Sequence, residues 1–156
     1  MRIISHRGNL DGPDLSVENL PQQIERCLAL GFECEIDLRT REGELFLGHD
    51  TCQYEIDLAW LMKNSNSLWI HCKDSESLSL LKRSDGRLNY FWHETDKHTI
   101  TSKGVFWNYP GGPITNDSIA VLPETWWDPS SHDPLKGAMG ICTDFPKKFR
   151  DELELV

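Results

Sequence analysis

The chain has 156 residues and a formal net charge of −9, because 25 Asp and Glu side chains outnumber 16 Lys and Arg. A chain of this length can bury the core of one compact domain, whereas two domains would each be small. The acidic balance, with no basic cluster of the kind that grips a phosphate backbone, makes nucleic acid and anionic membrane surfaces poor partners. We therefore expect a single domain over residues 1–156.

The N-terminus enters a strand pattern directly at Arg2 and lacks the apolar run of a signal peptide. No stretch approaches the ~20 apolar residues that a membrane span needs. The five cysteines are odd in number, and none forms a Cys-x-x-Cys pair. Buried reduced thiols explain them better than disulfides, a zinc site or a nucleophile. These features together favour a cytoplasmic protein.

The first half of the sequence alternates between strand and helix patterns. Strands are predicted over 2–5, 33–38, 44–47 and 68–72. Helices are predicted over 17–30 (with Ser16 as cap and Gly31 closing it), over 56–62, and over 75–82 (with Asp74 as cap). Strand, helix and strand in succession imply parallel pairing with right-handed crossovers, which indicates an α/β fold.

The second half changes character. Short strand-like runs are predicted over 89–93, 104–108, 118–122 and 139–142, and the helical segments between them nearly vanish. No internal repeat and no linker between domains interrupts the chain. Open sheet faces lose apolar burial, so an exposed outer wall in this half could pack against another copy. A homo-oligomer is therefore one expectation.

Polar motifs come at the ends of the strands in the first half. The alternation of a strand puts Glu35 and Asp37 on the same face. Two carboxylates that converge from one strand end repel each other unless a proton or a cation lies between them, and oxygen ligands suit a hard divalent ion such as Mg²⁺ or Ca²⁺. His6 beside Arg7 can move a proton next to a bound anion, and His49 follows the strand at 44–47.

The order of these motifs resembles the glycerophosphodiester phosphodiesterase family, relatives of the phosphatidylinositol-specific phospholipases C. The family pattern is matched by His6-Arg7-Gly8, Glu18-Asn19, Glu35-Ile36-Asp37, His49-Asp50 and Thr143-Asp144-Phe145-Pro146. Where the family carries Glu-x-Lys at a third strand end, this chain has His71-Cys72-Lys73. A lone His-Arg-Gly would be a weak signal, but five ordered motifs at suitable spacing are hard to obtain by chance.

The resemblance implies a metal-dependent phosphodiesterase, a phosphoric diester hydrolase acting on a small phosphodiester. In that family a hydroxyl next to the diester attacks phosphorus, and two histidines, here His6 and His49, act as general base and general acid. A divalent ion (Mg²⁺, Mn²⁺ or Ca²⁺) would be held by Glu35, Asp37 and His71, with Glu18 as a further candidate. Arg7 and Lys73 would neutralise charge on the phosphoryl oxygens.

The resemblance also implies a TIM-type barrel, which typically needs roughly 250 residues. The 156 residues of this chain fit a reduced (β/α) barrel of seven or eight strands, with few helices in its C-terminal half. If His6 points inward, strand parity pairs Glu35 with Asp37, His71 with Lys73, and Phe91 with His93 on inner faces. Each pair ends its strand at the carboxyl end, where barrel active sites gather.

Alternatives remain for several of these residues. Glu35 and Asp37 could instead form ion pairs with Arg39 and Arg41. Glu18 could simply complement a helix dipole. His71 either ligates, in which case Mn²⁺, Fe²⁺ and Zn²⁺ are tolerated as well as Mg²⁺, or donates a hydrogen bond to a phosphate oxygen.

The outer candidates are weaker. His93 is either a substrate contact or part of a surface loop, and Glu124 could bind sugar hydroxyls. Trp107, Trp126 and Trp127 could stack on a ligand, although packing is their more common use. As a whole, the sequence also allows a degenerate phosphate- or phosphosugar-binding module on the same barrel, or a phosphosugar lyase or isomerase.

Overall fold

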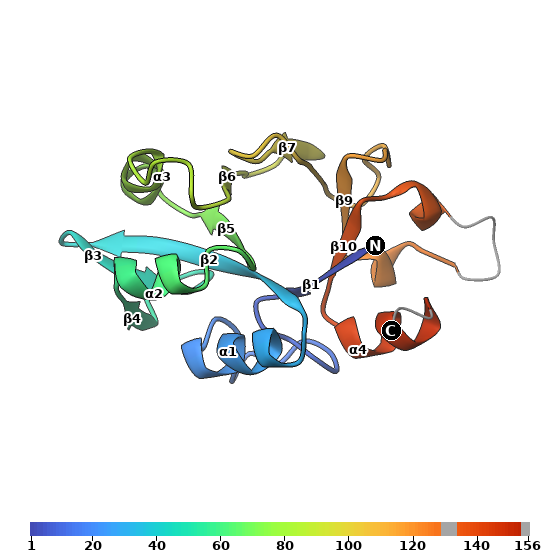
Figure 1. Cartoon of the computed structure of the whole chain (residues 1–156), viewed down its shortest axis with the longest axis horizontal. Coiled ribbons are helices and arrows are strands. Elements are labelled where there is room, and N and C mark those ends of the chain that lie inside the picture. The colour runs from blue at the N-terminus through green and yellow to red at the C-terminus, as the bar shows by residue number, and fades with distance from the viewer. Residues whose placement is uncertain (129–133, 154–156) are drawn as a thin grey trace.

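The computed structural model describes residues 1–128 and 134–153, and within them one curled sheet carries every strand (Figure 1). The elements are β1 (Arg2–His6), α1 (Pro21–Ala29), β2 (Glu33–Arg41), β3 (Glu44–Leu47), β4 (Tyr54–Ile56), α2 (Leu58–Lys63), β5 (Leu68–Cys72), α3 (Ser75–Lys82), β6 (Tyr90–Trp92), β7 (His98–Ile100), β8 (Phe106–Asn108), β9 (Ser118–Val121), β10 (Gly140–Thr143) and α4 (Pro146–Glu152). Two 3₁₀ turns, η1 (Pro123–Thr125) and η2 (Pro134–Gly137), lie between β9 and β10.

The parallel strands follow one another as β6, β5, β2, β1, β10, β9 and β8. The last strands of the chain therefore return to the first, because β10 pairs with β1 on the side opposite β2. Two antiparallel additions complete the sheet: the β3–β4 hairpin extends the far end of β2, and β7 pairs with β8. This is the strand order of a (β/α) barrel.

Helices cover the first half of this sheet and are scarce in the second. α1 links β1 to β2, α2 precedes β5, and α3 links β5 to β6. Among the described residues, no α-helix lies in the connections from β6 to β10, and α4 comes only after β10. Figure 1 shows α1 and α4 on the same side of β1. The predicted reduced barrel with a helix-poor C-terminal half is confirmed.

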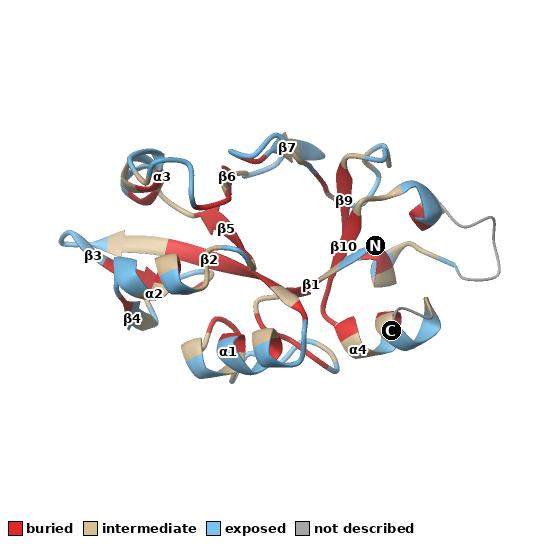
Figure 2. Ribbon diagram, viewed as in Figure 1, coloured by how far each residue is buried: buried red, intermediate tan, exposed pale blue. Residues whose placement is uncertain are grey.

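Strand alternation separates two layers of core. The outer layer packs helices on the sheet, with Ile24 and Leu81 against Ile36 and Ile70. The inner layer fills the barrel, and it contains Ile4, Trp69, Phe91, Trp107, Ile119, Val121 and Cys142. Figure 2 shows the resulting buried stretches along β2, β5, β9 and β10. The five cysteines are free, and four of them are buried, as predicted.

The start of α1 differs from its prediction, and three short elements were not predicted. The predicted helix over 17–30 begins only at Pro21, because Asn19 has a left-handed φ of 60° and Leu20 is extended. Proline at the first helical position lacks only an N–H that would have no helical partner. The strands β4 and β7 and the helix α4 were not predicted, since segments of three to seven residues carry little periodicity.

The outer face of the late strands is covered. Ala120 and Ile141 pack against Leu135 of η2 and Phe149 of α4. The open outer wall expected for this half is therefore absent at β9 and β10, and the homo-oligomer stays a prediction without that support. No helix among the described residues is long and apolar enough to cross a membrane.

Asp74 joins two elements near the carboxyl ends of the strands. Its carboxylate accepts hydrogen bonds from the Ser77 amide at 2.7 Å, as the predicted cap of α3, and from the Thr40 amide and hydroxyl at 2.8 Å each. Asp74→Ala should lower the free energy of unfolding by about 1–3 kcal/mol, because it removes the acceptor of the Ser77 and Thr40 amides and leaves the Thr40 hydroxyl with Glu76 alone. Urea denaturation measures this change. Ser79→Ala on the exposed face of α3 is the control, and an equal loss there would contradict the prediction.

Candidate metal centre and active site

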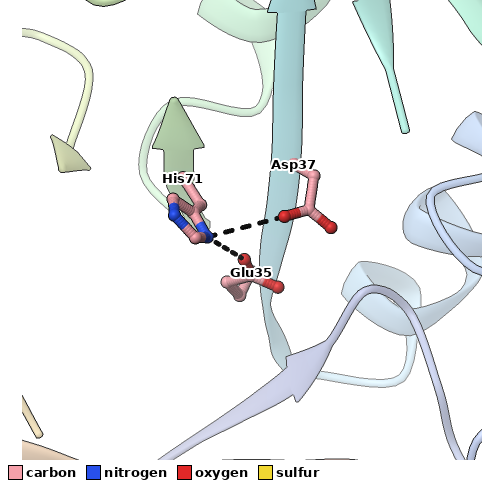
Figure 3. A group of neighbouring side chains, drawn as sticks. All are labelled: Glu35, Asp37 and His71. Atoms are coloured by element: carbon pink, nitrogen blue, oxygen red, sulfur yellow. Dashed lines mark ion pairs between the residues drawn. The ribbon is translucent and has the colours of Figure 1, made fainter. Parts of the chain in front are cut away.

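Glu35, Asp37 and His71 converge inside the barrel, as Figure 3 shows. The parallel register of β2 and β5 places Asp37 directly opposite His71. His71 Nδ1 lies 3.5 Å from Asp37 Oδ1 and 3.8 Å from Glu35 Oε1, and one ligand atom from each residue falls within 4.8 Å of the others. All three residues are buried, and the exposed fraction of each is 8% or less. Strand parity predicted this convergence.

Asp37 is held by the loop after β1. The Asn19 amide donates to Asp37 Oδ2 at 2.9 Å and its oxygen accepts the Asp37 backbone N–H at 2.9 Å. Arg7 Nε also lies 3.0 Å from Oδ2. Burial raises the pKa of Asp37, but the Arg7 charge and the Asn19 hydrogen bond more than offset it, so the pKa is lowered. One oxygen is thereby occupied, while the buried Oδ1 has no hydrogen-bond partner.

His71 presents an unprotonated nitrogen to the carboxylates. Its Nε2 lies 3.0 Å from the His93 carbonyl oxygen, which can only accept, so Nε2 carries the proton. Burial, and then the nearby Lys73 charge, lower the pKa of His71 to about 4. The ring also stacks on Phe91, with centroids 4.9 Å apart. His71 is therefore a neutral imidazole whose Nδ1 lone pair faces Glu35 and Asp37.

Glu35 completes the cluster. Its Oε2 is buried without a hydrogen-bond partner, and burial together with the Asp37 charge raises its pKa to about 7. The Nδ1 atom of His71 thus lies near Oε1 of Glu35 and the unpartnered Oδ1 of Asp37, while the unpartnered Oε2 of Glu35 lies on the side of His6. Such a group needs a proton or a cation to be stable, and its donor set fits a divalent metal ion.

His6 is oriented by a second carboxylate. Its Nδ1 donates to Asp144 Oδ1 at 2.8 Å, which leaves Nε2 on the side of Glu35 Oε2, 4.0 Å away. Burial lowers the pKa of His6, but the Asp144 hydrogen bond and the Glu35 charge outweigh it and the pKa is raised. Asp144 accepts a further bond from Asn9 at 2.8 Å. A histidine fixed at one nitrogen and free at the other is suited to proton transfer.

His49 lies on the other side of the site, on the turn after β3. A Cβ on Gly48 would fall 2.0 Å from the Thr51 carbonyl oxygen, so only glycine fits this turn. Arg39 donates to the carbonyl oxygens of Gly48 and His49 and holds the loop. The His49 side chain is 40% exposed, and its Nδ1 lies 2.7 Å from Asp50 Oδ1. His49 is therefore less constrained than His6.

A cavity of about 370 Å³ opens over this cluster. Among its walls are seven of the predicted site residues: His6, Arg7, Glu35, His49, His71, Lys73 and His93. Asp37 lies beneath them, 3.8 Å from Lys73 Nζ. His93 stacks on Tyr109 with ring centroids 3.7 Å apart, so it belongs to the cavity wall and not to a free surface loop.

Two predicted residues have other roles in the structure. Glu18 is bonded to Arg7 at 3.3 Å and to Asn9 at 3.0 Å, and it lies outside the group that can hold an ion. Glu124 does not line the cavity; it accepts bonds from the Thr143 hydroxyl at 2.9 Å and the Asp144 amide at 2.8 Å. Both carboxylates support neighbouring site residues, which the geometry favours over the ligand and substrate roles expected for them.

The alternative ion pairs with Arg39 and Arg41 are not formed. Arg39 bonds to loop carbonyls, and Arg41 lies over the Phe46 ring at 4.5 Å. The cations next to Asp37 are instead Arg7, which the sharp turn after β1 brings back toward β2, and Lys73.

Sequence reasoning missed the partner of His6 and the far wall of the cavity. Asp144 was visible only as part of the Thr-Asp-x-Pro motif, which gave no hint that it reaches the first strand. Trp92, Tyr109 and Leu122 line the cavity from short strands and a turn in the second half. No local pattern marks these residues, since a barrel interior is assembled from positions distant in sequence.

Two solved structures are similar to the chain over nearly its whole length. A glycerophosphodiester phosphodiesterase from Parabacteroides distasonis ATCC 8503 aligns over 98% of this chain and 96% of its own, with a TM-score of 0.59 and 14% identity. A protein from Galdieria sulphuraria to which the same activity is ascribed aligns over 98% and 97%, with a TM-score of 0.51 and 12% identity.

No protein-family model matches the sequence, and no curated protein matches it significantly. At sequence identities of 14% and 12%, the similarity to these two structures supports the fold alone. The chain has the fold of glycerophosphodiester phosphodiesterase structures, in agreement with the order of its motifs.

Proposed function

We propose that the protein is a metal-dependent phosphodiesterase that hydrolyses a small phosphodiester. The observation that supports this most is the buried group of Glu35, Asp37 and His71, whose unpartnered oxygens and neutral imidazole nitrogen face one another below a cavity. Binding alone would need such a group but would have no use for a proton-transfer pair. The cavity also holds His6, fixed by Asp144, and His49.

The cationic side chains would bind the phosphate. Lys73 follows β5 directly and lines the cavity, and Arg7 presents the guanidinium nitrogen that neither Asp37 nor Glu18 contacts. A divalent ion on Glu35, Asp37 and His71 would polarise a phosphoryl oxygen. Arg7 and Lys73 would neutralise the negative charge that grows on the phosphoryl oxygens as the new bond forms.

The two histidines would move the protons. One accepts the proton of a substrate hydroxyl as its oxygen attacks phosphorus, and the other protonates the alkoxide when the second P–O bond breaks. This attack produces a cyclic phosphate and releases the alcohol. Water then opens the cyclic phosphate, and the two histidines exchange their roles as base and acid. The Asp144 hydrogen bond keeps the His6 ring in place and sets its tautomer, with Nε2 available to the substrate.

The direct test measures turnover of glycerophosphodiesters with Mg²⁺, Mn²⁺ and Ca²⁺. We expect hydrolysis that depends on the ion and stops on chelation. Phosphate-ester binding without turnover under all three ions would instead identify a degenerate binding module on the same barrel.

Glu35→Gln tests the metal site with the least structural disturbance, because Oε2 of Glu35 has no hydrogen bond to lose. Removing one negative charge should weaken Mn²⁺ binding by at least ~10-fold, while the melting temperature without metal stays equal or rises as the repulsion with Asp37 disappears. Titration calorimetry and thermal melts measure both. Glu44→Gln, at the exposed first residue of β3, is the matched control. If the Mn²⁺ affinity of Glu35→Gln were unchanged, the metal site would have to lie elsewhere in the protein.

His6→Ala and His49→Ala should each lower turnover by ~10²–10⁴, the usual worth of general acid–base catalysis, with little effect on metal affinity. Asp144→Asn should lower kcat and leave KM nearly unchanged, since it disturbs the tautomer of His6 and not the phosphate contacts. Steady-state kinetics separates the two constants, and His98→Ala on exposed β7 is the control. Loss of metal in His49→Ala would assign that residue to the metal centre.

His71 should set the metal preference. Its neutral nitrogen is a softer ligand than a carboxylate and carries no charge, which favours Mn²⁺ or Zn²⁺ over Ca²⁺. His71→Glu should shift the preference toward Ca²⁺ and Mg²⁺ in competition calorimetry. His71→Gln, which adds no charge, should instead lower the affinity for every ion. An unchanged preference in His71→Glu would show that this side chain does not ligate.

A further inference from the structure

The cavity has two chemically different sides. The charged side comes from β1, β2, β5 and the turn after β3, and it carries His6, His49, His71, Arg7, Glu35 and Lys73. His93 follows β6 and stacks on Tyr109, so it lies on the opposite side. The opposite side comes from β6, β8 and the end of β9. There the cavity is lined by Trp92, Trp107, Tyr109, Val121 and Leu122, which we call the apolar wall. A phosphate held on the charged side would direct one of its two ester groups toward this wall.

The apolar wall has a closed floor and an accessible rim. Trp107 and Val121 are 1% and 3% exposed and belong to the inner core. Trp92, Tyr109 and Leu122 are half-buried, so they retain surface that a ligand can cover. The polar groups of its side chains are the Tyr109 hydroxyl and the indole N–H groups of Trp92 and Trp107, and the rest of their surface is carbon. Hydroxyl groups pressed against that carbon surface would lose hydrogen bonds to water, whereas an apolar group would gain from burial.

Leu122 holds an unusual backbone conformation at this wall. Its φ and ψ are 47° and 52°, in the left-handed region that costs free energy for a leucine. Its N–H donates to the Cys142 carbonyl oxygen at 2.7 Å, and its carbonyl oxygen accepts from the Thr125 amide at 3.0 Å. Glycine or asparagine would make the same backbone bonds with less strain. What leucine adds at this position is apolar surface on the inner core and the cavity.

We propose that the apolar wall binds an apolar ester group, and so selects diesters of apolar alcohols over those of polyols. This inference rests on the proposed function for the position of the phosphate. Glu94 at the exposed rim is the one carboxylate on this side of the cavity among the described residues, and it offers a cationic group a partner. The test therefore includes a cationic probe.

The experiment compares three phosphate monoesters that share a head group and differ only in the ester: phenyl phosphate, glycerol 3-phosphate and phosphocholine. Calorimetry of the full chain with Mg²⁺ should show phenyl phosphate binding at least ~10-fold more tightly than the other two. Equal affinities, or tighter binding of glycerol 3-phosphate or of phosphocholine, would overturn the proposal. This comparison needs no variant, so it does not depend on the folding of a mutant.

A variant then locates the selectivity. Leu122→Asn replaces an apolar side chain by a polar one of similar size, and asparagine tolerates the left-handed backbone. It should reduce the preference for phenyl phosphate at least ~5-fold and leave glycerol 3-phosphate nearly unaffected. Leu30→Asn makes the same change at an exposed leucine that does not line the cavity and should alter neither affinity. If Leu122→Asn kept the same preference for phenyl phosphate, the apolar wall would not be its cause.

Turnover separates this inference from the function on which it rests. The probe is 2-hydroxypropyl 4-nitrophenyl phosphate, which has both the neighbouring hydroxyl and an aromatic ester. Hydrolysis of glycerophosphodiesters together with equal binding of the three monoesters would leave the proposed function intact and refute the apolar wall. Selective binding of phenyl phosphate without turnover of any diester would do the reverse.

Discussion

The repulsion between two buried carboxylates governs the architecture of this site. Glu35 and Asp37 have ligand atoms within 4.8 Å of each other, where two full charges repel by about 3.5 kcal/mol at an effective dielectric constant near 20. The protein compensates the two carboxylates unequally. Arg7 and Asn19 neutralise and bind Oδ2 of Asp37, which lowers its pKa. The charges of His6, Arg7 and Lys73 act on Glu35 only from a distance and do not offset its burial, so its pKa rises to about 7. The imbalance leaves a defined position for one more positive charge.

Hydrogen bonds to the outer atoms of each ligand decide which inner atoms remain available. The His93 carbonyl fixes the proton of His71 on Nε2, and Asn19 occupies Oδ2 of Asp37. Asp144 fixes the proton of His6 on Nδ1 in the same way. Partners of this kind usually orient metal ligands and raise their basicity. The loop after β1 is therefore part of the site, although its Arg7 and Asn19 adopt left-handed backbone conformations.

How far the sequence predicts this structure depends on the range of each interaction. Parity along β2 and β5 is local, so the inward faces of Glu35, Asp37 and His71 followed from the sequence, as did the parallel pairing of the early strands. The cap at Asp74 was likewise local. The bond from Asp144 to His6 spans 138 positions and depends on β10 returning to β1, which no local pattern contains. The hydrogen bonds of Glu124 and Glu18 could not be predicted for the same reason, since charge alone does not say which backbone amide or side chain is within reach.

A barrel can lose helices from its later half without losing its site when the charged groups come from its early strands. Here β1, β2 and β5, with the residues that follow them, supply the candidate metal ligands, Arg7 and Lys73, and these strands keep their helices. From the late strands the site needs Asp144 and an inner face of large apolar side chains. The rings of Trp107 and Phe91 pack with their centroids 4.8 Å apart and fill the interior, while Leu135 of η2 and Phe149 of α4 cover the outside of β9 and β10. A short chain thus retains a packed inner core opposite the charged side of its cavity. The apolar wall is the part of that core, with its rim, that lines the cavity.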